Sequence, residues 1–194
     1  MIVLLRHTFA GLRVLLLMTL VLGIAYPLVI WGVSQAFGGR ADGSLITREG
    51  EVVGSSLIGQ AFEGDTWFLP RPSAAGDGYD PLSTSASNLG PENVELLAAV
   101  EERRAEVAER EGIDPAGVPP DALTASGSGL DPHISPDYAR LQVDRVAQAR
   151  SLGPQQVRDL VEAHSQGRIL GFLGEDRVNV LELNLDLDEL TGMP

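Results

Sequence analysis

The part of the sequence richest in side chains that could do chemistry runs from Thr124 to Ser135 and reads TASGSGLDPHIS. Ser128, Asp131 and His133 are the residue types of a serine hydrolase, in which a histidine activates the hydroxyl group. No G-x-S-x-G motif accompanies them, so a hydrolase site is the weaker interpretation. The stronger one is a structural loop in which short hydroxyl side chains, among them Thr124 and Ser126, bond the backbone up to a helix cap at the final serine.

Two other kinds of site could use the same stretch. A phosphate-binding loop needs glycine N–H groups followed by G-K-[ST], and the chain contains no lysine. A metal site needs several ligands at suitable spacing, and Asp131 with His133 supplies too few. We therefore expect no catalytic residues, no metal and no cofactor of the chain's own.

A second candidate is the Arg71-Pro72-Ser73 motif. An arginine in a rigid loop can clamp a carboxylate or a carbonyl edge. It can equally be an exposed or structurally paired side chain, and the residues alone leave both open.

The elements that would position these residues form an α+β domain. Strands are expected at 44–46, 52–53, 57–58 and 67–68, the first two joined by a hairpin turn at 48–51. Loops follow at 69–90 and 112–134, and a loop as long as the first is typically functional or disordered.

About three helices are predicted in the domain. The first starts near Pro91 and ends at Gly112, with Leu96, Leu97, Val100 and Val107 as its apolar stripe. Another is capped by Ser135, and a third starts after Gly153 and ends near Gly167. The tail reads as a closing β-hairpin: residues 169–173, a turn at 174–176, then a strand in which leucines 181, 183, 185 and 187 alternate with polar residues.

A membrane anchor is predicted at residues 14–33, after a short N-terminus at 1–13. The segment VLLLMTLVLGIAYPLVIWGV has no charge, and at about 1.5 Å per residue a helix of this length spans a hydrocarbon core of about 30 Å. A buried core helix and a cleavable signal peptide, with Ser34-Gln35-Ala36 as the cleavage site, are the alternatives. The uncharged run is longer than a signal peptide's apolar region, which favours a retained anchor.

Charge indicates the orientation of the anchor. Arg6, His7 and Arg13 precede the segment, so the positive-inside rule predicts a cytoplasmic N-terminus. Residues 34–43 read as a juxtamembrane linker, and 44–194 as a single extracytoplasmic domain. The chain beyond residue 33 carries 12 arginines against 27 acidic residues, a net charge of −15. Such a surface excludes nucleic acid as a partner and chiefly favours solubility.

A set of short motifs, in order over nearly the whole chain, resembles the C subunit family (KdpC) of Kdp-type potassium-transporting P-type ATPases. The motifs are Tyr26-Pro27-Leu28, Gly43–Ile46, Val53–Gln60, Phe68 with Arg71–Ala74, Ser87-Asn88-Leu89-Gly90-Pro91, Val118-Pro119, Leu123–Ser135, Arg145–Ala147 with Ala149-Arg150, and Val178–Asp186. The D-K-T-G phosphorylation motif of the hydrolysing subunit is absent from this chain.

The resemblance implies a non-catalytic accessory subunit in the plasma (inner) membrane of a bacterium or archaeon. Its partners would be a channel-like potassium-translocating subunit, a P-type ATP-hydrolysing subunit and a small membrane peptide, which bind the potassium, ATP and magnesium. The family is described as a catalytic chaperone that raises the ATP affinity of the hydrolysing subunit. An extracytoplasmic domain cannot touch cytoplasmic ATP, so this effect would pass through membrane segments. The alternative function is an anchored hydrolase that uses Ser128 and His133.

We expect the loops at 69–90 and 124–135 to contact partners or to serve as structural loops. The candidate residues in them are Arg71, Ser73, Asn88, Thr124, Ser126, Ser128, Asp131 and His133.

Overall fold

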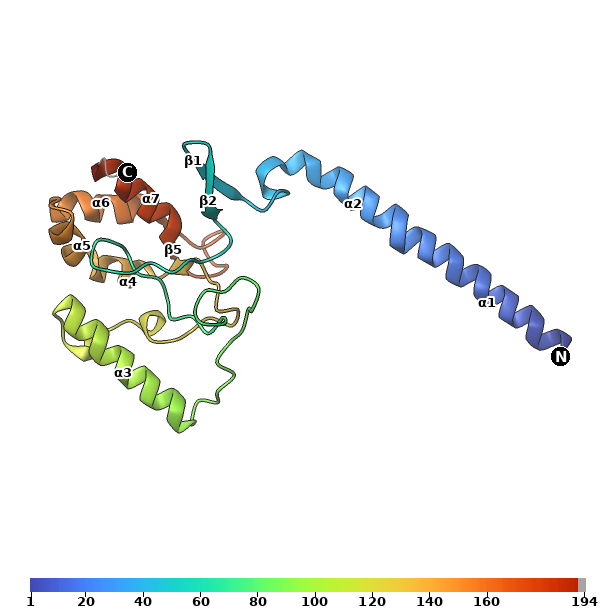
Figure 1. Ribbon diagram of the computed structural model, residues 1–194, viewed down its shortest axis with the longest axis horizontal. Coiled ribbons are helices and arrows are strands. Elements are labelled where there is room, and N and C mark those ends of the chain that lie inside the picture. Colours follow the sequence, from blue (N-terminus) through green and yellow to red (C-terminus); the bar gives the residue numbers. More distant parts are fainter. Residues whose placement is uncertain (192–194) are drawn as a thin grey trace. The chain divides into compact units, whose positions relative to one another are not determined.

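The computed structural model describes residues 1–191 and divides into two compact units, Met1–Leu45 and Ile46–Pro194 (Figure 1). The first unit is a helical rod. It comprises α1 (Ile2–Leu20), the π-helical turn η1 (Val21–Ala25), α2 (Tyr26–Ser34) and the 3-10 turn η2 (Gln35–Arg40). Within the described chain, this is the one helix long and apolar enough to cross a membrane, and none of its residues is buried. It starts twelve residues before the predicted anchor.

Pro27 explains the π-helical turn in the rod. Proline has no N–H to donate one turn back, and local π geometry is one way in which apolar helices satisfy the backbone groups that this frees. Here the Tyr26 N–H donates to the Val21 carbonyl, five residues earlier.

The second unit starts with the predicted hairpin. Strands β1 (Leu45–Arg48) and β2 (Glu51–Ser55) form a two-stranded sheet. Its two-residue turn has φ of 52° at Glu49 and 89° at Gly50, the positive values that a tight type I′ hairpin requires. The strand predicted at 57–58 is wrong, since these residues form a turn and a bend.

Helices are the main regular structure of this unit, and Figure 1 shows α4 to α7 gathered together with α3 to one side. They are α3 (Val94–Glu111), α4 (Pro136–Leu141), α5 (Val143–Ala149), α6 (Pro154–His164) and α7 (Val180–Thr191), with 3-10 turns η3 (Pro115–Gly117) and η4 (Pro120–Ala122). A small antiparallel sheet of β3 (His133–Ile134), β5 (Arg177–Asn179) and β4 (Ser165–Gln166) has β5 in the middle.

The cap residues account for the helix boundaries. Ser135 accepts a bond from the Tyr138 N–H at 3.0 Å and caps α4 as predicted. Gly112 ends α3 with φ of 66°. The start of α3 was predicted near Pro91, but Asn93 is the cap, its side chain accepting from the N–H groups of Glu95 and Leu96. Leu97, predicted to be buried, is exposed.

The C-terminal prediction is wrong: residues 180–191 are a helix, α7. The buried side chains are Val180, Leu181, Leu183, Asn184 and Leu187, a helical spacing. The alternation of leucines 181, 183, 185 and 187 suggested a strand, but the buried set includes Val180 and Asn184, and Leu185 is only half-buried. A closing hairpin does exist, but its strands are β4 and β5, and residues 169–173 lie in the loop between them.

The core draws on every helix of the second unit. Its members are Phe68, Val107, Ala108, Val118, Ala122, Leu123, Ile134, Tyr138, Ala139, Val143, Val146, Ala147, Val157, Val161, Val178, Val180, Leu183 and Leu187. The α+β class is confirmed, with α4 and α5 in place of one predicted helix and α7 in place of the last strand.

Residues 67–68 do not form the predicted strand. Side chains, and not a neighbouring strand, bond the backbone in this part of the chain. Each carbonyl from Asp65 to Leu69 accepts a bond from a side chain: those of Asp65 and Trp67 from Arg145, and that of Thr66 from Arg150. Asn184 and Gln142 bond the carbonyls of Phe68 and Leu69. Backbone groups that folding removes from water need hydrogen-bond partners, and here side chains supply the donors that a neighbouring strand would give.

Candidate functional site

Arg71 joins the two loops that the sequence singled out. Its guanidinium donates to Asp131 Oδ2 at 2.9 Å and to the Thr124 carbonyl at 3.3 and 3.4 Å. Both charged side chains are mostly covered, with 23% and 29% of their surfaces exposed. A partly buried, charge-assisted pair holds more firmly than a surface pair, so loops 53 to 60 residues apart in sequence meet here.

Ser73 fixes the turn that carries Arg71. Its hydroxyl donates to the Gly129 carbonyl at 2.7 Å and accepts from the Tyr79 and Ala75 N–H groups at 2.8 and 3.2 Å. Tyr79 returns a bond from its hydroxyl to the Arg71 carbonyl. Burial, supported by the negative charge of Asp131, raises the pKa of Tyr79, so its phenol stays protonated and donates.

Gly129 is where the two loops come closest. Its φ is 70°, and a Cβ there would lie 2.7 Å from both the Ala75 nitrogen and the Ser85 carbonyl oxygen. Next to it, the Ser128 carbonyl accepts from the Thr84 hydroxyl at 2.7 Å and the Ser85 N–H at 3.0 Å. Close backbone contact therefore requires a glycine at position 129 of the S-G-S-G run.

Asp131 connects the junction to His133, at the start of β3. Its Oδ1 accepts from the His133 N–H at 3.0 Å and lies 3.3 Å from His133 Nδ1. Burial opposes ionisation of the carboxyl group, but the hydrogen bonds from His133 and the charge of Arg71 outweigh it, so the pKa of Asp131 lies below its usual value. The carboxylate is thus ionised and committed to structural partners.

The serines are not arranged for hydrolysis. Ser128 Oγ accepts from the Leu130 N–H at 3.1 Å and lies 3.4 Å from Ser126 Oγ. Among the described residues the His133 ring bonds Asp131 and no serine hydroxyl, whereas a triad needs a bond between base and nucleophile. Thr124 likewise serves structure, its hydroxyl donating to the Pro120 carbonyl.

Asn88 is the one candidate residue that the structure does not bring to this junction. It is exposed, has φ of 53°, and its side chain donates to the Ala86 carbonyl at 3.1 Å. Asparagine tolerates this left-handed conformation better than most residues, which explains a turn role.

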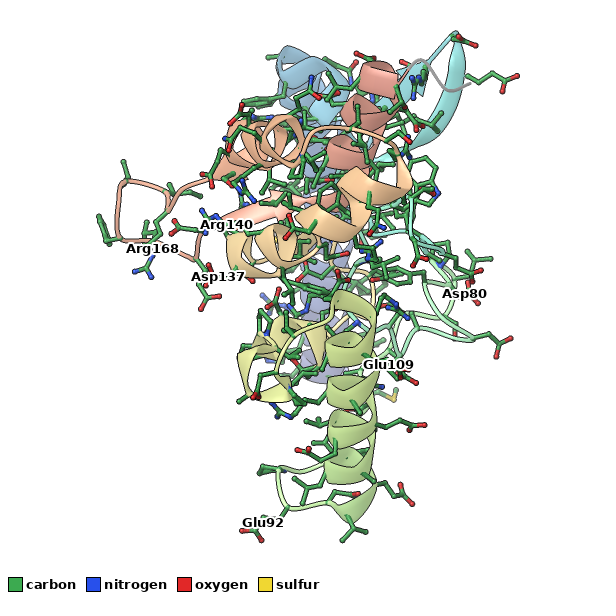
Figure 2. All side chains as sticks on the ribbon, turned by 90° about the vertical axis from the view of Figure 1, so that its left-hand side faces the viewer. Asp80, Glu92, Glu109, Asp137, Arg140 and Arg168 are labelled. Carbon is green, nitrogen blue, oxygen red and sulfur yellow. The ribbon has the colours of Figure 1, made fainter. Side chains whose placement is uncertain are left out.

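Two grooves border the junction, and Arg71 lines both. One, of about 630 Å³, is lined by His133 and by the charged residues Asp121, Asp131, Asp137, Glu175, Asp176 and Arg177 besides Arg71. The other, of about 540 Å³, has Arg103, Arg110 and Glu106 on its walls and Phe62, Leu69, Val107 and Tyr138 among its apolar lining. Figure 2 labels Asp137 and Arg140, on the helix that starts beside the first groove.

Sequence reasoning missed three contributors. Asp121 bonds both the N–H and the hydroxyl of Ser135, at 2.7 and 2.9 Å, and so orients the cap of α4. The Gly59 N–H donates to the Leu130 carbonyl at 2.8 Å. Tyr79 is the third contributor. As the only aromatic residue of the 69–90 loop, it is the one of the three that the sequence alone could have indicated. Within residues 1–191, no group of three or more His, Asp or Glu side chains could hold a metal ion.

Comparison with known proteins gives one consistent result. A family model described as "KdpC: K+-transporting ATPase, c chain" matches residues 8–189. The Potassium-transporting ATPase KdpC subunit of Kineococcus radiotolerans is 60% identical over 184 residues, which cover 95% of this chain and 94% of that protein. The protein of the same name from Mycobacterium tuberculosis is 53% identical, with 95% and 99% covered, and that from Cereibacter sphaeroides is 51% identical, with 94% and 96% covered.

Proposed function

The chain belongs to the KdpC family of potassium-transporting ATPase subunits, and from this premise we propose that it stabilises the assembled uptake complex through its anchor and through the loop junction around Arg71. It is a non-catalytic subunit of that complex. The observation that carries the proposal is the relationship to KdpC proteins over 95% of the chain. Together with one membrane-length helix, it favours an assembly role over chemistry.

The proposed partners are the channel-like potassium-translocating subunit, the ATP-hydrolysing P-type subunit and the small membrane peptide. The part of the rod at residues 14–33 offers them an uncharged helical surface. Gly23 and Gly32 lack a side chain, which allows the backbone of another helix to approach closely.

We propose that the second unit lies on the extracytoplasmic side and contacts the potassium-translocating subunit near its outer mouth. Arg6 and Arg13 at the start of the rod support this orientation. The two grooves beside Arg71 are the proposed contact surface, since they present both signs of charge around a firmly held loop junction. A prearranged surface loses little entropy when a partner binds.

The proposed chaperone effect on ATP affinity follows from the same arrangement. With this orientation the second unit cannot reach cytoplasmic nucleotide, so any change in ATP affinity passes through the membrane helices. A subunit that binds one conformation of the hydrolysing partner better than another shifts its equilibrium, and with it the apparent affinity for ATP.

Co-purification tests the assembly role. Tagged full-length chain, expressed with its genomic neighbours, should retain a multi-spanning potassium-translocating protein and a P-type ATPase on the affinity resin. Arg71→Ala should lower both the retained amounts and growth at limiting potassium. Arg158→Ala, which removes an exposed arginine of α6, should not.

Two results would contradict parts of the proposal separately. Wild-type chain that retains neither partner would refute the subunit assignment. Full retention and growth with Arg71→Ala, at unchanged chain abundance, would leave the assignment intact but move the contact surface away from the junction.

A further inference from the structure

The loop between β4 and β5 exposes four large apolar side chains in five residues. The exposed fractions are 59% for Ile169, 79% for Leu170, 68% for Phe172 and 49% for Leu173, and every residue from 166 to 177 is exposed. Single exposed apolar residues are common, but a contiguous group on one loop indicates an interaction surface.

This apolar tip is a turn held by backbone hydrogen bonds. Ile169 and Leu173 exchange two backbone hydrogen bonds at 2.9 and 3.0 Å, and the Gly171 N–H donates to the Arg168 carbonyl at 3.0 Å. Asp176 closes the base of the loop by accepting from the Arg168 N–H at 3.1 Å. Figure 2 shows the loop projecting from the rest of the unit, with Arg168 labelled on it.

Leu170 argues that the apolar character has a purpose outside the fold. Its φ is 55°, followed by 80° at Gly171, and the Phe172 N–H donates back to the Ile169 carbonyl. This is the tight turn whose first central position prefers Asn, Asp or Gly. A leucine at this position has a strained backbone and an apolar side chain exposed to water. Neither the geometry of the turn nor the solubility of the protein therefore explains the leucine.

The charge around the tip favours a lipid surface over a charged protein face. Arg168 and Arg177 balance Glu175 and Asp176, so the loop is neutral on a chain whose residues after 33 carry a net charge of −15. A neutral apolar loop is the part of such a chain that approaches a bilayer with least repulsion. Arginines beside an apolar tip can also reach headgroup phosphates.

A short tether keeps the second unit close to the bilayer. The membrane-length rod ends at Arg40 and β1 starts at Leu45, so four residues, at most about 14 Å of extended chain, separate the rod from the first strand. A tethered unit meets the membrane at high effective concentration, so weak insertion suffices.

We propose that the tip formed by Ile169, Leu170, Phe172 and Leu173 inserts into the interfacial layer of the leaflet facing the second unit. Arg168 would lie at headgroup level. This second attachment would restrict the swing of the unit about its tether, independently of any partner subunit.

The chain has no cysteine, so single labels can test this in the full-length protein. Phe172→Cys, carrying an environment-sensitive fluorophore, is placed in phosphatidylcholine vesicles with and without spin-labelled lipid. Leu82→Cys is the matched control, an apolar side chain 95% exposed in another loop. The label at 172 should shift its emission to the blue and lose intensity with spin-labelled lipid, while the control should remain water-exposed and unquenched.

Leu170→Asn separates the apolar role from the turn. Asparagine suits the positive φ, so thermal stability should hold or rise, while lipid quenching of the label at 172 should fall. A label at 172 that stays water-exposed in vesicles and in the assembled complex would overturn the proposal. One that escapes lipid quenching but becomes shielded from aqueous quencher only when partner subunits are present would overturn it in favour of a protein contact.

Discussion

Asn184 on α7 pairs with the backbone of Phe68 as a neighbouring strand would. Its side-chain oxygen accepts from the Phe68 N–H at 2.9 Å, and its amide donates to the Phe68 carbonyl, also at 2.9 Å. Gln142 does the same for Leu69, at 2.7 and 3.1 Å, and both amide side chains are buried. Two buried amides therefore tie the segment before Arg71 to the helical core.

Replacing Asn184 with leucine should destabilise the chain strongly. The change leaves the Phe68 N–H and carbonyl buried without partners, which costs about 2–4 kcal/mol in the free energy of unfolding. Thermal unfolding of the full chain in detergent measures it. Asn88→Gly is the control, because it removes an exposed amide with one local bond and keeps a residue suited to the φ of 53°. Equal midpoints for the two variants would show that water or backbone movement replaces the lost bonds.

The same residue shows where sequence reasoning succeeds and fails. The membrane-length helix, the first hairpin and the cap at Ser135 were predictable because each depends on local composition or on a short-range bond. The prediction of a strand at 181–187 was wrong because the alternating pattern placed Asn184 on the solvent-exposed face, whereas its side chain is buried. The signal for the helix was N-V-L-E, in which Asn179 caps by accepting from the Glu182 N–H at 3.2 Å.

The sequence predicted which residues lie at the loop junction but not which of them contact one another. Seven of the eight candidate residues lie at it, because hydroxyls, glycines and an acid in a loop must find backbone partners somewhere. Which partners they find depends on contacts 44 to 60 residues away, such as Thr84 with Ser128 and Arg71 with Asp131. No local pattern encodes these contacts, and Asn88 shares the composition without joining them.

Asp131→Asn should lower stability in a pH-dependent way. The folded pKa of Asp131 lies below its usual value of about 3.9. Its contribution is therefore present above about pH 4 and lost as pH falls through the folded pKa. We expect a cost of about 1 kcal/mol at pH 7, with the gap between variant and wild type closing in acid.

Unfolding midpoints of wild type and variant between pH 3 and pH 7 measure the effect of Asp131. Asp137→Asn is the control, because this carboxylate lines the same groove but has 80% of its side chain exposed. A gap that is as wide in acid as at neutral pH would mean that the carboxylate charge contributes nothing.

Glu111 should show the opposite dependence on pH. Burial raises its pKa despite the nearby Arg145, which donates to Oε1 at 2.9 Å, and Oε2 is buried without a partner among the described residues. A raised folded pKa makes the favourable contribution complete below the unfolded pKa and lost as pH rises through the folded value. Glu111→Gln should therefore gain stability relative to wild type as pH rises above about 4.3.

The control for Glu111 lies on the same helix. Glu109, labelled in Figure 2, is exposed, and Glu109→Gln should track wild type across the range. A difference between Glu111→Gln and wild type that stays constant with pH would indicate that the ion pair with Arg145 offsets the desolvation of the carboxylate.

Gly129→Ala should disrupt the loop junction while its neighbour tolerates the same change. The new Cβ would lie within 2.7 Å of backbone atoms of Ala75 and Ser85, at a φ of 70° that alanine disfavours. Because backbone on both sides cannot yield cheaply, we expect a loss of about 2 kcal/mol or more in stability and weaker co-purification of the partner subunits. Gly127→Ala has no atom within 4 Å of its Cβ and no positive φ, so it should match wild type in both measurements. If Gly129→Ala lost stability yet retained partners in full, the junction would be structural and the contact surface would lie elsewhere on the unit.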